Sequence, residues 1–171
     1  LHPVAHSFPT RRSSDLPLIR LLGRDLVMYI VTGGAGFIGS AVVWKLNQQG
    51  IDDILIVDHL GPSDKWKNLV NRRYADYMHK DTFIKKVAGG GFDQAAAIIH
   101  MGACSSTTER DADYLMANNV HYSKTLAQFA LSRDIRFINA SSAATYGDGS
   151  DGFSDDSDRL NTLVPLNMYG Y

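Results

Sequence analysis

The sequence predicts an α/β fold in which a parallel, doubly wound sheet is covered by helices on both faces. Apolar runs such as Ile54–Val57 and Ala95–His100 lack the alternation of a half-exposed strand, so these strands are expected to be buried on both sides. Segments with helical spacing separate the runs, which is the order of parallel strands joined by crossover helices. With 171 residues, of which 44% are hydrophobic, the chain can bury the core of about one domain.

The charge and cysteine content exclude several classes of protein. Seventeen basic and 18 acidic side chains leave a net charge of −1, so we expect neither a nucleic acid nor a membrane as partner. The single cysteine cannot form an intramolecular disulfide, which fits the reducing cytoplasm. No apolar run reaches the ~20 residues that a membrane-spanning helix needs.

The two ends of the chain differ from the rest. Residues 1–27 lack periodicity and resemble the translation of a sequencing-library adapter, so we expect a non-native segment followed by one domain over 28–171. A twin-arginine export signal at Arg11-Arg12 is the alternative, but Arg20 and Arg24 interrupt the apolar stretch that such a signal requires. At the other end, Tyr171 follows no domain-closing signal, and the chain is expected to be truncated.

The first half of the fold can be assigned from short apolar runs. Met28–Thr32 is β-branched and apolar and predicts the first strand. Apolar residues at helical spacing follow from Phe37, and Gly50 stands where a helix C-cap is expected. Ile54–Val57 predicts the second strand, which Asp58 closes before a polar loop.

The second half continues the alternation of strands and helices. A short helix is expected at Asp81–Ala88 and a third strand at Ala95–His100. A long helix at Asp111–Ser132 precedes a fourth strand at Arg136–Ala140. The Asp-, Ser- and Gly-rich segment Gly147–Asp158 predicts an exposed loop.

Three glycines between the first strand and the first helix predict a dinucleotide-binding turn. Without a Cβ, Gly33, Gly36 and Gly39 allow a tight turn whose N–H groups approach a pyrophosphate at the positive end of the helix. Asp58 lies 19 residues past Gly39, at the end of the second strand, where a carboxylate accepts hydrogen bonds from an adenosine ribose. The alternatives are a plain tight turn and a strand-end carboxylate in a solvated loop.

The identity of the cofactor stays open at this point. Asp58 by itself favours NAD over NADP. Lys65 and Lys67 lie a few residues further on and can offset a 2′-phosphate, which favours NADP. Ordinary surface charge is the alternative role for these lysines and for Lys80.

A serine and a tyrosine are the candidate catalytic residues. Ser142 follows the fourth expected strand, at the carboxyl edge where ligands bind in such sheets. Tyr169 lies 27 residues later, at an expected helix start. A phenol acts as a base at neutral pH only where positive charge lies close, and the lysine that usually supplies it would lie two residues beyond Tyr171. The alternatives are a strand cap for Ser142 and a core aromatic for Tyr169.

Taken together, these motifs resemble the extended short-chain dehydrogenase/reductases of the nucleotide-sugar epimerase/dehydratase type. The resemblance runs from Met28 to Tyr171 and implies the N-terminal portion of a Rossmann-type doubly wound sheet. The most specific segments are similar to family members that act on an ADP-heptose: His100–Glu109, Asn118-Asn119, Ala140–Gly147 and Pro165–Tyr171.

The resemblance also implies an activity and its partners. It implies epimerisation at C6 of an ADP-glycero-manno-heptose with bound NADP, or possible use of NAD, for the lipopolysaccharide inner core. A hydride leaves the sugar carbon, the resulting carbonyl is held, and the hydride returns to the opposite face. The resemblance further implies a cytoplasmic homo-oligomer of the full-length protein, with no metal.

The family's functional residues carry over to matching positions of this chain. Ser142 would hydrogen-bond the substrate and Tyr169 would be the acid/base. Two positions depart from the family pattern, since His59 replaces Asn and Met101 replaces Glu. Cys104 is implied to be a cofactor-loop residue and not a nucleophile, because no His–Asp pair has a spacing that would activate it. The implied cofactor-binding positions are Gly33, Gly36, Phe37, Ile38, Gly39, Asp58, His59, Lys65, Lys80, Met101, Gly102, Ala103, Cys104, Ser105 and Asn118.

Three alternatives to this function remain from the sequence. The first is a sibling enzyme, such as a 4-epimerase or a 4,6-dehydratase, that acts on another nucleotide sugar. The second is a dinucleotide-binding module without catalysis, and the third is a structural protein without a ligand. The 171-residue chain itself is expected to be inactive and poorly stable, because it lacks the catalytic lysine and leaves an apolar sheet edge uncovered.

Overall fold

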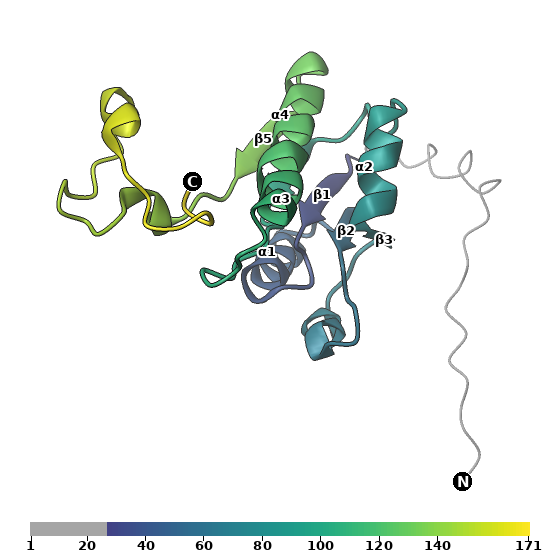
Figure 1. Cartoon of the computed structure of the whole chain (residues 1–171). Coiled ribbons are helices and arrows are strands. Elements are labelled where there is room, and N and C mark those ends of the chain that lie inside the picture. The colour runs from purple at the N-terminus through teal and green to yellow at the C-terminus, as the bar shows by residue number, and fades with distance from the viewer. Residues whose placement is uncertain (1–26) are drawn as a thin grey trace, which may run out of the picture.

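Five parallel strands form one sheet in the order β3-β2-β1-β4-β5 in the computed structural model, which describes residues 27–171 (Figure 1). The predictions of a non-native segment and of an export signal concern residues outside this range, apart from Val27. The chain adds β2 and β3 on one side of β1, then returns to add β4 and β5 on the other. The strand order therefore reverses between β1 and β4, where α/β sheets bind their ligands. The strands are β1 (Tyr29–Thr32), β2 (Ile54–Asp58), β3 (Asp76–His79), β4 (Ala97–His100) and β5 (Arg136–Asn139).

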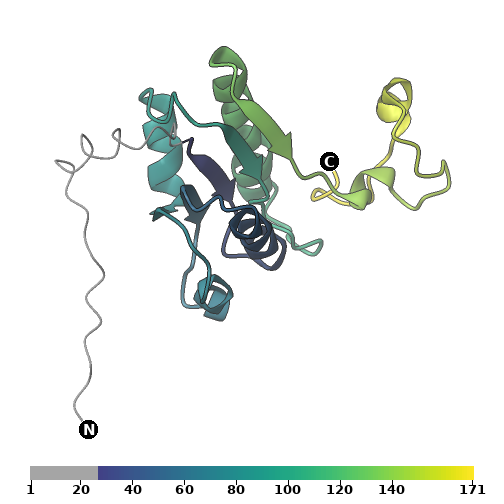
Figure 2. The same cartoon turned by 180° about the vertical axis from the view of Figure 1, so that it is seen from behind.

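Helices cover both faces of the sheet, as Figures 1 and 2 show from opposite sides. One face packs against α2 (Lys80–Ala88) and α4 (Tyr122–Ser132). The other face packs against α1 (Phe37–Gln48) and a 3₁₀ helix, η3 (Asp64–Leu69). The doubly wound arrangement expected from the uniformly apolar strands is confirmed.

Alternate residues of the strands supply two core layers. Ile30 and Leu55 face the layer that contains Phe83 of α2 and Leu126 of α4. The neighbouring strand residues, including Val31 and Ile56, face the layer under α1. Because both sets are less than 3% exposed, the central strands have no solvent-facing side.

The long helix predicted at Asp111–Ser132 is present, with a change of geometry in its middle. Asp111 caps it by accepting a hydrogen bond from the Tyr114 N–H at 2.9 Å. The helix then runs as α3 (Ala112–Leu115), a π-helical turn η4 (Met116–His121) and α4. The π turn contains Asn118 and Asn119, and such bulges are frequent at functional sites.

Three local features differ from the expectation. β3 was not predicted, because Asp76–His79 mixes polar and apolar residues on a half-covered edge strand. The polar loop after Asp58 contains η3, which Ser63 caps. Tyr169 lies in a turn and not in a helix of the described chain.

The segment after β5 extends away from the sheet (Figures 1 and 2). It contains two 3₁₀ helices, η5 (Ala143–Tyr146) and η6 (Ser157–Thr162), with the predicted exposed loop between them. A Cβ on Gly147 would lie 2.2 Å from the Val164 carbonyl oxygen, so this segment folds back onto itself. Among the described residues, no helix is both long enough and apolar enough to span a membrane.

Candidate functional site

The predicted site residues gather at one edge of the sheet. Gly33 follows β1, Asp58 ends β2, and Lys80 follows β3. Met101 follows β4, and Ser142 lies shortly after β5. Because all five strands are parallel, their carboxyl ends meet at the same edge, which collects the first four positions, whereas Ser142 begins the segment that extends away from the sheet (Figure 1).

The glycine turn is shaped by backbone contacts that leave no room for side chains. Gly33 has φ +65°, and a Cβ there would lie 2.8 Å from the Gly102 backbone. A Cβ on Gly39 would lie 2.0 Å from the Gly33 carbonyl oxygen. The turn therefore packs closely on α1 and on the loop after β4, and the predicted strand–turn–helix geometry is confirmed.

The N-terminus of α1 is open to an anion. Gly36 is its N-cap and supplies no side-chain hydrogen bond, and the first turn has no acidic residue. The side chains of Phe37 and Ile38 are 88% and 61% exposed, so they lie to the outside of the helix end. Free N–H groups and the helix dipole at this end suit a pyrophosphate.

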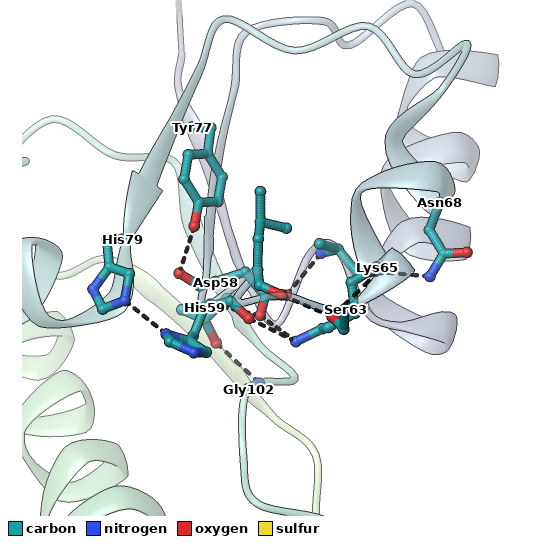
Figure 3. Close-up of polar contacts among 11 residues, drawn as sticks. Asp58, His59, Ser63, Lys65, Asn68, Tyr77, His79 and Gly102 are labelled. Atoms are coloured by element: carbon teal, nitrogen blue, oxygen red, sulfur yellow. Dashed lines mark hydrogen bonds and ion pairs between the residues drawn. The ribbon is translucent and has the colours of Figure 1, made fainter.

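Asp58 is buried and holds the glycine turn in place (Figure 3). Its side chain is 5% exposed. One carboxylate oxygen accepts a hydrogen bond from the Ala35 N–H at 2.9 Å, within the turn. The other accepts from the His59 N–H at 2.7 Å and from Lys65 Nζ at 2.6 Å. Three donors thus neutralise and orient a carboxylate for which the sequence predicts only a ribose contact.

Two residues that sequence reasoning did not assign support the same region. Asn68 donates a hydrogen bond to the Ala35 carbonyl oxygen at 2.9 Å (Figure 3). Tyr77 donates to the Asp58 carbonyl oxygen at 3.0 Å, and burial raises the pKa of this phenol, which keeps it a donor. Neither residue has a sequence signal, because η3 and β3 that carry them were not predicted.

The basic residues of this region have different partners. Lys65 reaches back to Asp58 and also donates to the His59 carbonyl oxygen at 3.2 Å. Lys67 instead pairs with Asp64 at 2.8 Å, on the surface of η3. The His59 ring is within 2.8 Å, nitrogen to nitrogen, of the His79 ring (Figure 3). Of the two lysines, only Lys65 thus reaches Asp58.

Lys80 and Asn118 line one hollow of about 330 Å³ between α2 and the π turn. Lys80 pairs with Asp81 at 2.9 Å, and this hydrogen bond lowers the pKa of the Asp81 carboxyl. Asn118 donates to the side-chain oxygen of Asn119 at 3.0 Å. The sheet and the π turn therefore bring together two predicted cofactor positions that are far apart in sequence.

The loop 101–105 is fixed from both sides. At its start, the Gly102 N–H donates to Thr32 Oγ1 at 3.1 Å. Further along, the Asn119 amide accepts from the Cys104 N–H at 2.8 Å and donates to the Cys104 carbonyl oxygen at 3.0 Å. Met101 and Cys104 are half-buried, whereas Ala103 and Ser105 are exposed. The sequence motif Asn118-Asn119 assigns no role to Asn119, and the folded chain shows that it holds this loop.

The candidate catalytic residues lie in the C-terminal segment. Ser142 accepts a hydrogen bond from the Ala144 N–H at 3.2 Å, and it lines a hollow of about 550 Å³ with Tyr146 and Tyr171. Tyr169 is half-buried in the neighbouring turn. A Cβ on Gly170 would lie 2.5 Å from the Ala144 carbonyl oxygen, so the turn that carries Tyr169 packs against η5.

The whole described region matches one protein family. Residues 29–171 match the NAD dependent epimerase/dehydratase family. A Nitratidesulfovibrio vulgaris protein (strain Hildenborough) named ADP-L-glycero-D-manno-heptose-6-epimerase is 65% identical over 145 residues, which cover 84% of this chain and 45% of that protein. A Fusobacterium nucleatum protein of the same name is 55% identical over 147 residues, or 84% of this chain and 44% of that one. The chain thus spans less than half the length of these relatives.

Solved structures share the fold. The crystal structure of Helicobacter pylori ADP-L-glycero-D-manno-heptose-6-epimerase superposes with a TM-score of 0.69 at 23% identity, covering 87% of this chain and 48% of that one. A Bacillus cereus UDP-glucuronic acid 4-epimerase in complex with NAD gives a TM-score of 0.64 at 23% identity, covering 84% and 48%. These similarities confirm the predicted Rossmann-type sheet.

Proposed function

Because this chain belongs to the NAD dependent epimerase/dehydratase family, we propose that it is the cofactor-binding portion of an enzyme that inverts C6 of an ADP-glycero-manno-heptose, using NADP, for lipopolysaccharide core synthesis. The observation that carries the proposal is 65% identity over 145 residues with a protein named for that epimerisation. The homo-oligomer, the cytoplasmic location and the domain boundary at Met28 stay predictions.

The residues at the sheet edge suit a nicotinamide dinucleotide. At Gly33 and Gly39 a Cβ would meet backbone atoms of the chain itself, so these glycines let the turn pack closely against α1 and the loop after β4. The uncapped end of α1 supplies N–H donors for a pyrophosphate beside this turn. Asp58, His59 and Lys65 would hold the adenosine ribose, and the 101–105 loop would line the nicotinamide side.

The state of Asp58 favours NADP over NAD. A strand-end carboxylate selects NAD when its oxygens are free to accept the ribose hydroxyls and its charge repels a 2′-phosphate. Here the Asp58 oxygens already accept three hydrogen bonds, and Lys65 offsets the charge at 2.6 Å. Lys65 remains 38% exposed, so its ammonium can also reach a phosphate.

The chain's own residues would perform the proton chemistry. When bound, the nicotinamide dinucleotide supplies reversible hydride transfer. Ser142, which lines the 550 Å³ hollow, would donate a hydrogen bond to the sugar oxygen at the reacting carbon. Tyr169 would take the proton from that oxygen and later return it, so that the oxygen alternates between hydroxyl and carbonyl.

A pair of lysine variants tests the choice of cofactor. We expect Lys65→Met to weaken NADP binding about tenfold, because a charge-assisted contact to the phosphate is lost, with little change for NAD. Lys67→Met is the matched control: it removes an equal charge two residues away, from a lysine that pairs with Asp64. Calorimetric titration of both variants measures this, and an equal loss for NAD and NADP would contradict the proposed role.

The substrate is tested by turnover in the whole protein that carries this sequence. We expect interconversion of the two C6 epimers of ADP-glycero-manno-heptose, followed by proton NMR of the sugar. UDP- and dTDP-hexoses are the comparison substrates. Turnover of these hexoses without turnover of the heptose would replace the proposal with a sibling epimerase or dehydratase.

A further inference from the structure

His100 is a buried, titratable side chain that the proposed mechanism does not use. It ends β4, is 2% exposed, and its ring stacks between Tyr122 and Phe137 at centroid distances of 5.8 and 6.1 Å. This burial lowers the pKa of His100 to about 4, so the imidazole is neutral at pH 7. A neutral imidazole has one N–H donor and one acceptor nitrogen.

The neighbouring hydroxyls determine which nitrogen carries the proton. Ser123 donates its only hydroxyl proton to the Asn119 carbonyl oxygen at 2.5 Å. Its oxygen can therefore only accept from His100 Nε2, which lies at 2.8 Å. The ring proton is thus on Nε2, and Nδ1 is an acceptor.

On the other side of the ring, His100 Nδ1 contacts the hydroxyl of Thr32. Because Nδ1 accepts, Thr32 Oγ1 donates its proton to it. Thr32 Oγ1 in turn accepts from the Gly102 N–H at 3.1 Å. The hydrogen bonds therefore all run the same way: Gly102 donates to Thr32, Thr32 to His100, His100 to Ser123, and Ser123 to the Asn119 carbonyl oxygen.

Both ends of this hydrogen-bond chain lead to the loop 101–105. One end is Gly102, whose backbone touches Gly33 of the glycine turn. The other end is the Asn119 backbone, and the Asn119 side chain holds Cys104 through its N–H and its carbonyl oxygen. Reversal of the His100 tautomer would place two acceptors, Nε2 and the Ser123 oxygen, against each other, whereas Thr32 Oγ1 could still accept from a protonated Nδ1.

We propose that His100, with its ring proton on Nε2, is a positioning residue that fixes the loop 101–105 against the glycine turn and so pre-forms the cofactor cleft. The link to the cofactor rests on the proposed function, whereas the tautomer and the order of the loop do not. His100 would act through Gly102 and Cys104, without touching the cofactor itself.

The tautomer is measured first, on the unmodified chain. Long-range proton–nitrogen correlation NMR of the His100 ring at pH 7 distinguishes the two neutral forms. We expect the proton on Nε2 and an unprotonated Nδ1. A proton on Nδ1 would overturn the proposal, and this test needs no variant to fold.

Two substitutions of His100 separate the ends of the hydrogen-bond chain. His100→Asn keeps an acceptor near the place of Nδ1, and His100→Gln keeps a donor near the place of Nε2. In His100→Asn we expect the Cys104 amide to exchange faster while the Gly102 amide stays protected. In His100→Gln we expect the Gly102 amide to exchange faster while the Cys104 amide stays protected. Equal exchange of both amides in the two variants would contradict the directed chain.

Ser123→Ala tests the effect on the cofactor. It leaves Nε2 without its acceptor, so we expect faster exchange at Cys104 and NADP binding about five- to tenfold weaker. Ser132→Ala is the matched control, because Ser132 also donates to a carbonyl oxygen of α4, that of Phe129 at 2.8 Å, but has no link to His100.

The outcomes separate the two proposals. Weaker NADP binding in Ser123→Ala but not in Ser132→Ala supports the positioning role, whereas equal loss in both variants would overturn it. If the whole protein that carries this sequence binds no nicotinamide dinucleotide, the proposed function fails. The tautomer and the exchange pattern then decide by themselves whether His100 fixes the loop.

Discussion

The glycine-turn region and the segment 141–171 both carry predicted site residues, but they hold them in different ways. In the first region, Asp58 is 5% exposed and bonds to the turn, and Gly33 touches the loop after β4 through backbone atoms. In the second, Ser142 is held by a local capping bond, and Phe153 and Val164 nearby are 71% and 73% exposed.

This contrast indicates how each function is positioned. Buried hydrogen bonds and close backbone contacts fix the cofactor residues as part of the core, so changes there should cost stability and binding together. Ser142 and Tyr169 lie in turns whose close backbone contacts, at Gly147 and Gly170, stay within the segment itself, so changes of side chains there should affect chemistry with little effect on folding. Paired substitutions, one in each region, therefore test whether stability and binding depend on the two regions differently.

The largest effect is expected for Gly39→Val. The new Cβ would meet the Gly33 carbonyl oxygen, and α1 would have to move away from β1. We expect a loss of about 3 kcal/mol or more in the free energy of unfolding, measured by urea denaturation, and loss of dinucleotide binding. Gly152→Ala is the control in the other region, because a Cβ there meets nothing within 4 Å and only the positive φ of +79° adds a cost, about 1–2 kcal/mol. A loss of similar size in both variants would remove the contrast.

The next effect is a dependence of stability on pH that comes from His100. Unfolded histidine takes up a proton near pH 6.5, whereas the folded residue does so only at about pH 4. Between these values the unfolded state binds more protons, so stability rises with pH. We expect the free energy of unfolding to fall by roughly 3 kcal/mol as the pH drops from 6.5 to 4.

The pH effect is measured by urea denaturation across this range. His100→Asn removes the titrating group and should flatten the curve. An unchanged slope in the variant would assign the dependence to other groups.

A smaller loss is expected for Asp58→Ala. The change leaves the Ala35 N–H and the His59 N–H without an acceptor and leaves Lys65 without its partner. We expect the free energy of unfolding to fall by about 2 kcal/mol. Asp64→Ala removes a carboxylate that pairs with exposed Lys67 and should change stability much less. If Asp58→Ala and Asp64→Ala lower the stability equally, as measured by thermal and urea denaturation, then Asp58 does not hold the glycine turn in place.

The smallest effect on stability is expected for Ser142→Ala. The lost capping bond to the Ala144 N–H should cost about 0.5–1 kcal/mol, with unchanged affinity for NADP. In the whole protein, turnover should fall about 10²-fold because the substrate loses a positioned donor. Ser154→Ala removes a similar turn bond, to the Asp156 N–H, and should leave turnover unchanged. Weaker NADP binding in Ser142→Ala would place this serine in the cofactor site.

The sequence predicts those parts of the molecule that depend on local pattern. β1, β2, β4 and the glycine turn follow from apolar runs and from glycine spacing, and β5 follows from the shorter apolar pair in Arg136–Ala140; the structure confirms all of them. β3 escapes detection because an edge strand needs no continuous apolar run. The sequence also cannot separate Lys65 from Lys67, since the direction in which η3 turns decides which of them reaches Asp58.

The hydrogen-bond chain through His100 shows a second limit. Thr32, His100 and Ser123 come from three elements, and no spacing in the sequence relates them. The only local signal is a polar residue at the end of an otherwise apolar strand. Asn119 gains its role because the π turn places its amide beside Cys104, and propensities do not predict a π turn inside a long helix.

Titration of the purified chain with NADP and with NAD, followed by amide NMR, tests whether this sheet edge is a pre-formed cofactor site. We predict binding of one NADP, tighter than NAD, with the largest shifts at Gly33, Gly36 and Gly102 and little change at Ser154. Absence of binding, or shifts confined to the segment 141–171, would contradict the account.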